Sequence, residues 1–349
     1  RIIKIIIHKI SKMKENSIDD DKEEKDMQIR TDLAIENREI YREENKGEVP
    51  GVEVEQEEGA DYTVTRVNIL DPIGANNMGK PVGIYITIEV PKLKNTDQEL
   101  RDEISKLLAK EIKGIGYNHK NTKTLIVGLG NWNVTPDALG PKVVDRVMVT
   151  RQFFVNYNKD EDETVANVSA LSPGVMGLTG IETGEIIKGI VEKTEPDLII
   201  AIDALASRKM ERVSTTIQIT DTGINPGSGI GNKRIGLNED YLGVPVLAIG
   251  VPTVVDAATM INDTMDLIIG AMKDKATVGG DFYSLLENIS KEEKYYLIRE
   301  VLEPYMPNVV VTPKEIDLII DDLSIIIANG LNMALHHGID LKDVNRYMR

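Results

Sequence analysis

Short apolar runs alternate with amphipathic stretches along most of the chain, starting near Asp61. The segments TVTRVNIL (63–70) and GIYITIEV (83–90) alternate with a period of two, and the turn-rich DPIGANNMGKP separates them. This pattern predicts two strands joined by a long hairpin. The later pattern predicts strands at 124–130, 166–171, 197–205, 213–219 and 245–250, and helices at about 97–113, 141–154, 181–194 and 254–272.

The last predicted helix runs to about Leu335 and places its apolar residues on one face, namely Ile316, Ile319, Leu323, Ile326 and Ile327. Short, continuously apolar strands between helices are typical of strands that are buried on both sides. The chain is therefore expected to have an α/β fold, with a largely parallel twisted sheet and helices on both faces.

The N-terminal region follows a different pattern. Residues 14–28, KENSIDDDKEEKDMQ, have no apolar periodicity and carry like charges in blocks, which is typical of a solvated segment. Residues 1–12 are rich in Ile and Lys, precede Met13, and are assigned no role. We expect a disordered tail over residues 1–32 and a single α/β domain over 33–349, with an exposed insertion near 273–292.

Composition narrows the class of protein. The 349 residues include no Cys and carry a formal net charge of -16. Disulfides and thiolate chemistry are therefore excluded, and direct nucleic-acid binding is disfavoured because phosphate neutralisation needs clustered Lys and Arg. No run approaches the roughly 18 apolar residues of a membrane helix, so we expect a cytoplasmic protein without membrane contact. No His lies beside a Ser in a nucleophile motif.

The first candidate for chemistry is VGLGNWNVTPDALGPK (127–142), which connects an apolar strand to a helix. In an open α/β sheet, ligands bind at the carboxyl ends of such strands. A dinucleotide-binding interpretation is weak, because Asn133 stands where a third glycine is needed. Asp137, in the loop, is either a functional carboxylate or a helix-capping aspartate, with about even odds.

The second candidate is Asp203, which follows the very apolar strand DLIIAI. It is either a half-desolvated functional acid or a cap of the next helix. Two acids at the ends of different parallel strands can meet in one crevice, where they would share a proton and activate water. Thr253 and Asp256 resemble a helix cap, which we prefer over a catalytic role.

Two glycine-rich segments follow predicted strands. They are SPGVMGLTG (172–180) and DTGINPGSGIGNKR (221–234), and neither matches a phosphate-binding P-loop. Their glycines can expose backbone N–H groups to an extended peptide, although ordinary turns explain them equally well. The glycines of the possible substrate cleft are Gly174, Gly177, Gly227 and Gly229.

Several long motifs occur in the order of one known family. They include VGLGNWNVTPDALGPK, SPGVMGLTGIET, IIAIDALASR, DTGINPGSGIGNKR, GVPTVVDA, VTPKEID and GLNMALHH. Over about residues 28–345 the chain resembles the germination protease of spore-forming bacteria. The resemblance implies an endopeptidase of the forespore and spore core that degrades small acid-soluble spore proteins during germination.

The resemblance also implies specific residue roles. Asp137 and Asp203 match the proposed catalytic pair, which would make the enzyme an atypical aspartic-type protease. The family's zymogen removes its own propeptide within a motif similar to QIRTDLAIE (28–36), so the expected cut lies between Asp32 and Leu33. The substrates contain the same kind of acid-apolar-Ala sequence. The family forms homotetramers.

The family's fold is similar to that of the hydrogenase maturation endopeptidases, whose carboxylates bind a metal with a His from a later strand. This chain has no His between PVLAIG (245–250) and His336. We therefore expect catalysis without metal or cofactor. The alternatives are a metal-dependent maturation endopeptidase and a non-catalytic module that binds a nucleotide or metabolite.

Overall fold

The structure is a computed structural model that describes residues 31–116, 122–157, 164–226, 235–275 and 309–343. The chain divides into two compact units. The larger contains residues 31–255 and 312–349, and the smaller contains residues 1–30 and 256–311. Thr31 and Asp32 thus belong to the larger unit, not with the residues that precede them.

One sheet forms the centre of the larger unit, with the strand order β1-β2-β3-β7-β8-β6-β4-β5. Its strands are β1 (Val52–Glu58), β2 (Thr63–Ile69), β3 (Gly83–Glu89), β4 (Lys123–Gly128), β5 (Asn167–Leu171), β6 (Leu198–Ser207), β7 (Thr216–Thr220) and β8 (Val246–Asp256). The pairs β5–β4, β4–β6 and β6–β8 are parallel, whereas every pair from β8 through β7, β3 and β2 to β1 is antiparallel. The α/β class is confirmed, and the sheet is mixed, with more antiparallel pairing than the pattern predicts.

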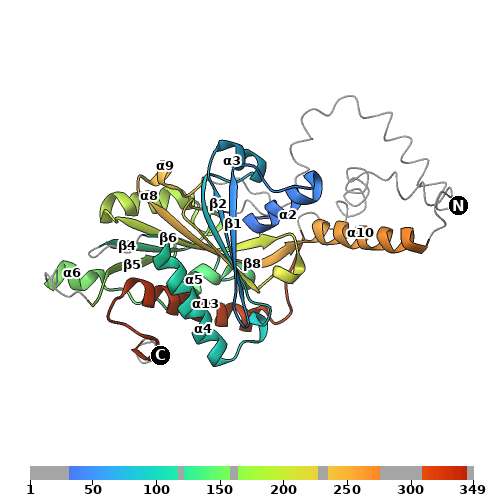
Figure 1. Cartoon of the computed structure of the whole chain (residues 1–349). Helices are drawn as coiled ribbons and strands as arrows, with labels where there is room; N and C mark the ends of the chain where they lie inside the picture. Colours follow the sequence, from blue (N-terminus) through green and yellow to red (C-terminus); the bar gives the residue numbers. More distant parts are fainter. Residues whose placement is uncertain (1–30, 117–121, 158–163, 227–234, 276–308, 344–349) are drawn as a thin grey trace. The chain divides into compact units, whose positions relative to one another are not determined.

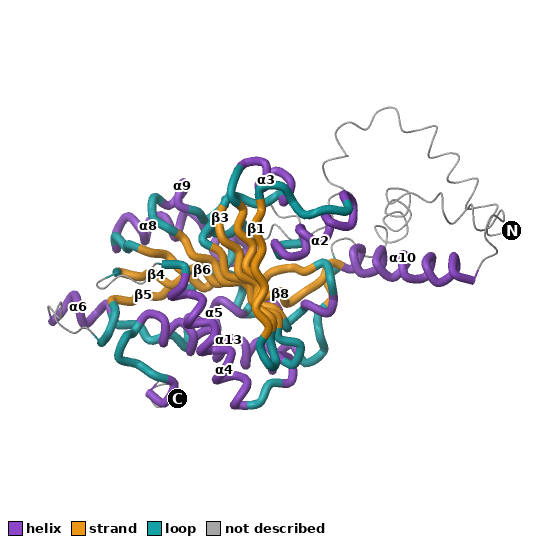
Figure 2. The backbone as a smooth tube through the Cα atoms, viewed as in Figure 1, coloured by secondary structure: helices purple, strands orange, loops and turns teal. Residues whose placement is uncertain are grey.

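Helices cover both faces of this sheet (Figures 1 and 2). The helices are α2 (Ala34–Asn45), α3 (Pro72–Met78), α4 (Gln98–Gly114), α5 (Leu139–Val144), α6 (Arg151–Tyr157), α7 (Met176–Thr179), α8 (Thr183–Thr194), α9 (Glu239–Leu242) and α13 (Ile316–Leu335), with 3-10 turns η2 (Leu93–Asn95), η3 (Thr135–Asp137) and η4 (Met210–Arg212). On one face, α4, α5 and α13 pack against an isoleucine-rich core. On the other, α8 covers the parallel strands, and α2 and α3 cover β2 and β3.

Helix α13 is the part of the described chain that is long and apolar enough to cross a membrane. However, 67% of its most apolar window is buried inside the fold. All of the residues predicted for its apolar face are buried, so α13 is built like the core helix of a globular unit.

The pattern of elements differs from the predicted one in several places, and the helices α2, α7 and α9 were not predicted. Strand β1 was not predicted, because its acidic sequence VEVEQEE carries little apolar signal. The connection between β2 and β3 contains α3. The helix predicted over 141–154 is broken into α5 and α6, since Thr150 bonds to β5 instead of continuing the helix: its N–H donates to the Val168 carbonyl at 2.8 Å and its hydroxyl to the Ala166 carbonyl.

The smaller unit contains α10 (Ala257–Lys275) and β9 (Val310–Val311). Asp256 caps α10, because its Oδ1 accepts hydrogen bonds from the N–H and the hydroxyl of Thr259 at 2.9 and 3.1 Å. The helix-cap interpretation is thus confirmed for Asp256, whereas Thr253 lies within β8. Most of the insertion expected near 273–292 lies outside the described residues.

Helix α5 lies directly on the end of β4 because both contribute glycine at the contact. A Cβ atom on Gly140 would lie 2.3 Å from the carbonyl oxygen of Leu129 and 2.5 Å from its nitrogen. This close approach fixes the loop between β4 and α5, which carries Asp137.

We expect Gly140→Ala to destabilise the protein by at least about 2 kcal/mol, because backbone atoms that cannot give way would meet the new methyl group. Gly189→Ala is the matched control: this helical glycine of α8 has nothing within 4 Å of an added Cβ. The control should gain about 0.5–1 kcal/mol from helix propensity. Urea unfolding of both variants measures the difference, and equal effects would contradict the close packing.

Candidate functional site at the ends of the parallel strands

Asp137 is held by the loop that leaves β4. The N–H of Asn131 donates to both the backbone oxygen and the carboxylate Oδ2 of Asp137, at 3.0 and 2.9 Å. Gly130 allows the loop to fold back toward Asp137, because its φ of +111° is one that glycine adopts readily. An added Cβ would lie 2.0 Å from the Asp137 carbonyl oxygen. Asp137 thus lies between strand and helix, as predicted, at the end of η3.

Asp203 lies within β6, which extends further than predicted, to Ser207. Its side chain is almost completely buried, with 6% exposed, and its Oδ1 accepts from the N–H of Ala204 at 2.9 Å. The last residue of β4, Gly128, pairs with Ile202, so Asp203 comes directly after the paired part of these neighbouring strands. Asp137 therefore follows the end of β4, and Asp203 lies in the neighbouring parallel strand just beyond its pairing with β4, near the strand end where α/β proteins bind ligands.

A row of three paired residues connects Asp203 to the antiparallel half of the sheet. Gly250 of β8 pairs with Asp203 on one side and with Gln218 of β7 on the other. Paired residues project to the same face of a sheet, so the Asp203 and Gln218 side chains share a face, on which the side chain of Leu205 covers Gly250.

Residues 31–36 of the RTDLAIE motif are docked on this part of the sheet. Asp32 bonds to Ala206 of β6 twice: its N–H donates to the Ala206 carbonyl at 3.0 Å, and its Oδ2 accepts from the Ala206 N–H at 2.9 Å. Leu33 is fully buried in a small cluster with Ile35 and Leu205. The segment therefore packs as part of the larger unit, a few residues along β6 from Asp203.

Two polar side chains hold the peptide group between Asp32 and Leu33. The carbonyl oxygen of Asp32 accepts from Nζ of Lys80 at 2.9 Å and from Nε2 of Gln218 at 3.2 Å. Oε1 of Gln218 accepts from the N–H of Ala34 at 2.7 Å. Neither Lys80 nor Gln218 was predicted from the sequence. The sequence does contain a signal for Gln218, because this polar residue stands between two isoleucines in the run IQI of a predicted strand.

Glu36 anchors the segment from its C-terminal side. Its side chain is buried, and its carboxylate accepts from the N–H groups of Arg208 and Lys209 at 2.7 and 3.0 Å. The hydroxyl of Thr31 also donates to Glu36. Because a buried carboxylate is costly without partners, these hydrogen bonds fix the position of the chain between Thr31 and Glu36.

Arg212 extends this anchor to the following turn of α2. Its guanidinium donates to Glu36 at 3.4 Å, to Glu39 at 2.6 and 2.9 Å, and to Glu89 of β3 at 2.9 Å. Burial alone would raise the pKa of Glu39, but hydrogen bonds and charges of Arg212 and Lys209 lower it to about 2. Helix α2 is thus tied to the sheet by charge.

His336 has a structural position. Its Nδ1 accepts from the N–H of Ala166 at 3.1 Å, which leaves Nε2 to donate to the Met148 carbonyl at 3.2 Å. Burial lowers the pKa of His336, so the neutral ring is favoured. Within the described residues, no three His, Asp or Glu side chains gather in a way that could hold a metal ion.

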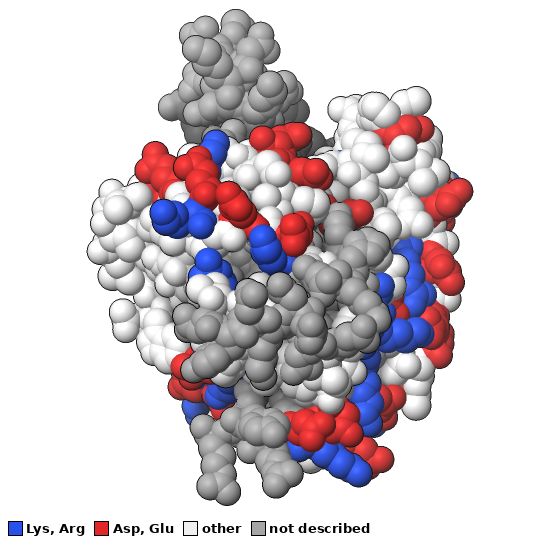
Figure 3. Space-filling model, turned by 90° about the vertical axis from the view of Figure 1, so that its left-hand side faces the viewer, with Lys and Arg blue, Asp and Glu red and all other residues white. Residues whose placement is uncertain are grey.

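The candidate cleft glycines are described only in part. Gly174 has a φ of +76° in the loop after β5, and Gly177 lies in α7 with open space around it. Gly227 and Gly229 lie outside the described residues. On the face drawn in Figure 3, Lys and Arg side chains lie among Asp and Glu side chains. That the protein does not bind nucleic acid stays a prediction.

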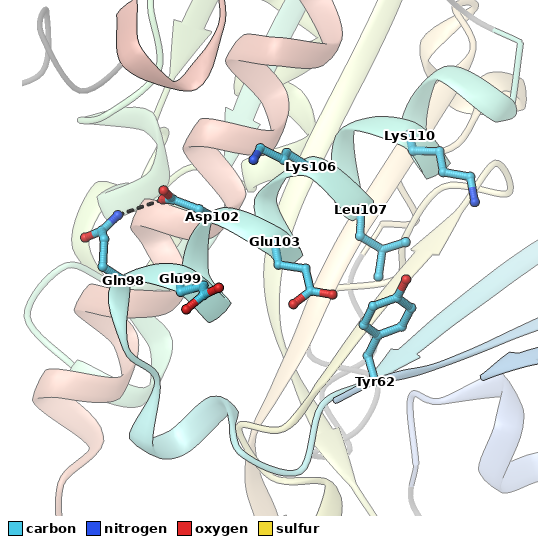
Figure 4. Close-up of a pocket in the computed structure, with 8 residues that line it drawn as sticks. All are labelled: Tyr62, Gln98, Glu99, Asp102, Glu103, Lys106, Leu107 and Lys110. Atoms are coloured by element: carbon cyan, nitrogen blue, oxygen red, sulfur yellow. Dashed lines mark hydrogen bonds between the residues drawn. The ribbon is translucent and has the colours of Figure 1, made fainter. Parts of the chain in front are cut away.

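A surface hollow lies elsewhere, between the exposed side of α4 and Tyr62 (Figure 4). It is lined by Tyr62, Gln98, Glu99, Asp102, Glu103, Lys106, Leu107 and Lys110. Within it, Gln98 donates to Asp102 at 2.7 Å, as the dashed line shows. Because α4 covers the sheet face opposite to Asp203, this hollow takes no part in the candidate site.

The fold and the two aspartates define an α/β protein with an acidic site where adjacent parallel strands end. Comparison with known proteins specifies the class further. The family model "Germination protease" matches residues 28–281 and 272–348. The chain belongs to the germination protease family, and it is a protease.

Its relatives align over nearly their whole length. The germination protease of Caldanaerobacter subterraneus subsp. tengcongensis is 51% identical over 92% of this chain and 98% of its own. The germination protease of Clostridium perfringens strain ATCC 13124 is 51% identical over 92% of this chain and 99% of its own. For Bacillus mycoides the germination protease is 45% identical, with 91% and 96% covered.

A solved structure of the NiFe hydrogenase maturation protease HycI from Thermococcus kodakarensis KOD1 aligns with 56% of this chain and 97% of its own. The identity is 17% and the TM-score is 0.27. The α/β class of the present chain is established by its own strand order and helix packing.

Arg212→Met should destabilise the protein by about 3–5 kcal/mol, because it removes the cation that contacts the buried Glu36 and the partly buried Glu39 and Glu89. Arg42→Met is the control: Arg42 lies on α2, the helix that Arg212 contacts, and it is exposed and pairs with Glu48, and such pairs contribute about 0–1 kcal/mol. Urea unfolding at neutral pH compares the two variants. If Arg212→Met loses no more stability than Arg42→Met, the ion pairs of Arg212 are unimportant for stability.

Glu39 should contribute to stability in a defined pH range. Its pKa is lowered from 4.5 to about 2, so the folded state favours the ionised form. The contribution is present above the unfolded pKa and is lost as pH falls through the folded pKa. The difference in melting temperature between wild type and Glu39→Gln should therefore shrink between pH 4.5 and about 2. Glu43→Gln, at an exposed ion pair, should show no such trend.

Proposed function

We propose that the chain is the zymogen of a spore-germination endopeptidase that cuts itself between Asp32 and Leu33 by means of the Asp137 and Asp203 carboxylates. After this cut the enzyme degrades small acid-soluble spore proteins at similar acid-apolar-Ala sequences. It acts without a metal cofactor, as a homotetramer in the forespore and spore core. Membership of the germination protease family supports the protease class and the role in germination.

The docking of residues 31–36 is the observation that carries this proposal. Asp32 is bonded to Ala206 on the strand that bears Asp203, and Leu33 is buried next to Leu205 of that strand. A segment held on the sheet in this way needs no encounter step, because it is covalently attached to its own enzyme. Its position supports cutting in cis.

The proposed reaction is a hydrolysis in which one carboxylate acts as general base and the other as general acid. The ionised aspartate takes a proton from water, whose oxygen bonds to the carbonyl carbon of Asp32. The protonated aspartate then donates to the Leu33 nitrogen as the C–N bond breaks. The products are a carboxylate at Asp32 and an amine at Leu33. This reaction requires that the two carboxylates share a single proton, which acids held close together do.

The test is incubation of the purified full chain at neutral and mildly acidic pH, followed by intact mass measurement and N-terminal sequencing. We expect loss of residues 1–32 and a new N-terminus at Leu33, faster at the lower pH and unchanged by a chelator. Asp137→Asn and Asp203→Asn should each slow the cut at least about 100-fold, since each removes one proton-transfer group.

The control is Asp145→Asn, because Asp145 is an exposed aspartate at the end of α5, close in sequence to Asp137. It should cut at the wild-type rate. An intact N-terminus in the wild-type chain would refute self-processing. Unchanged cutting in both site variants would refute the aspartate pair, and loss of cutting that one divalent ion restores would favour a metal-dependent enzyme.

A further inference from the structure

The carbonyl group of Asp32 is contacted in an unusual way for a peptide group at the start of a helix. Leu33 is the N-cap of α2, so the Asp32 oxygen precedes the helix and is not needed as a helical acceptor. Instead it receives two side-chain donors from distant parts of the chain, Nζ of Lys80 at 2.9 Å and Nε2 of Gln218 at 3.2 Å. Within the proposed self-processing reaction, this oxygen belongs to the bond that is cut.

The orientation of the Gln218 amide is determined by its neighbours. The N–H of Ala34 can only donate, so Oε1 must face it, and Nε2 is then directed at the Asp32 oxygen. Gln218 is almost completely buried, which limits alternative rotamers. It therefore spans Leu33, with one end on the carbonyl before it and the other on the N–H after it.

Lys80 supplies a second donor, which is charged when protonated. It follows α3, and its own N–H is bonded to the Ala75 carbonyl at 3.2 Å, which fixes the start of the side chain. Burial lowers the pKa of Lys80, and the charges of Asp32 and Glu36 oppose that effect. An ammonium group that is partly removed from water interacts more strongly with a nearby oxygen than an exposed one does.

We propose that Lys80 and Gln218 stabilise the oxyanion that forms on the Asp32 carbonyl oxygen during the cut. When water bonds to the carbonyl carbon, the C–O double bond becomes single and the oxygen takes the electron pair. The two N–H donors already point at this oxygen, so they meet the developing charge without rearrangement. When the C–N bond to Leu33 breaks, the carbonyl is restored and the Leu33 nitrogen leaves with a proton. The proposal rests on the proposed function.

The test measures the first-order rate of self-cutting in the full chain. Lys80→Met should slow it about 100-fold or more, the usual effect of losing one oxyanion donor. Lys80→Arg keeps a cationic donor and should recover at least a tenth of the wild-type rate. Gln218→Glu keeps an acceptor for the Ala34 N–H but loses the N–H donor, so it should also be slow. Lys94→Met, at another lysine whose pKa burial lowers, should leave the rate unchanged.

Hydrogen exchange of the Ala34 amide separates stabilisation of the oxyanion from simple docking. In Lys80→Met this amide should stay as protected as in the wild type, because its bond to Gln218 remains. Slow cutting with loss of that protection would mean that Lys80 only holds the segment, and the inference would be wrong. A rate within threefold of wild type would also overturn it, without affecting the proposed function. A wild-type chain that never cuts at Leu33 would overturn both.

Discussion

The buried carboxylate of Glu36 is the charge on which the arrangement around the candidate site depends. It accepts from the backbone N–H groups of Arg208 and Lys209, which directly follow β6, and from Arg212. These partners fix the first turn of α2 against the end of the strand that carries Asp203. The chain immediately before that turn then has little freedom, so Asp32 pairs with Ala206 and its carbonyl faces Lys80 and Gln218.

The mixed sheet also contributes to the position of the docked segment. Its parallel half contains Asp203 in β6 and the end of β4 that leads to Asp137, where the crevice of an α/β protein is expected. Its antiparallel half contributes Gln218, and Gly250 lies between the two. Any larger residue at that position would project toward the side chain of Leu205, which packs on Leu33. The docked segment therefore uses both halves of the sheet at the line where they join.

Local signals in the sequence were sufficient for most of the fold. Strands and helices with strong apolar periodicity, such as α4, β4 and α13, were predicted close to their observed bounds. Strand β1 was not, because charged residues occupy most of its positions. The break between α5 and α6 was not predicted either. It depends on hydrogen bonds from Thr150 to β5 and its start, and a local stretch of sequence does not reveal such contacts. Asp203 was predicted at a strand end and lies inside a longer strand.

By itself, the sequence determined the α/β class and the position of Asp137 and Asp203 next to buried strands, because burial patterns are local. That RTDLAIE is a substrate-like sequence stays a prediction. Only the tertiary structure decided that this segment is docked, and by which side chains. Ala34 and Gln218 are 184 residues apart, and Asp32 and Lys80 are 48 residues apart. Such contacts depend on strand order and register, which no periodicity encodes, so the donors to the Asp32 carbonyl could be identified only in the folded chain.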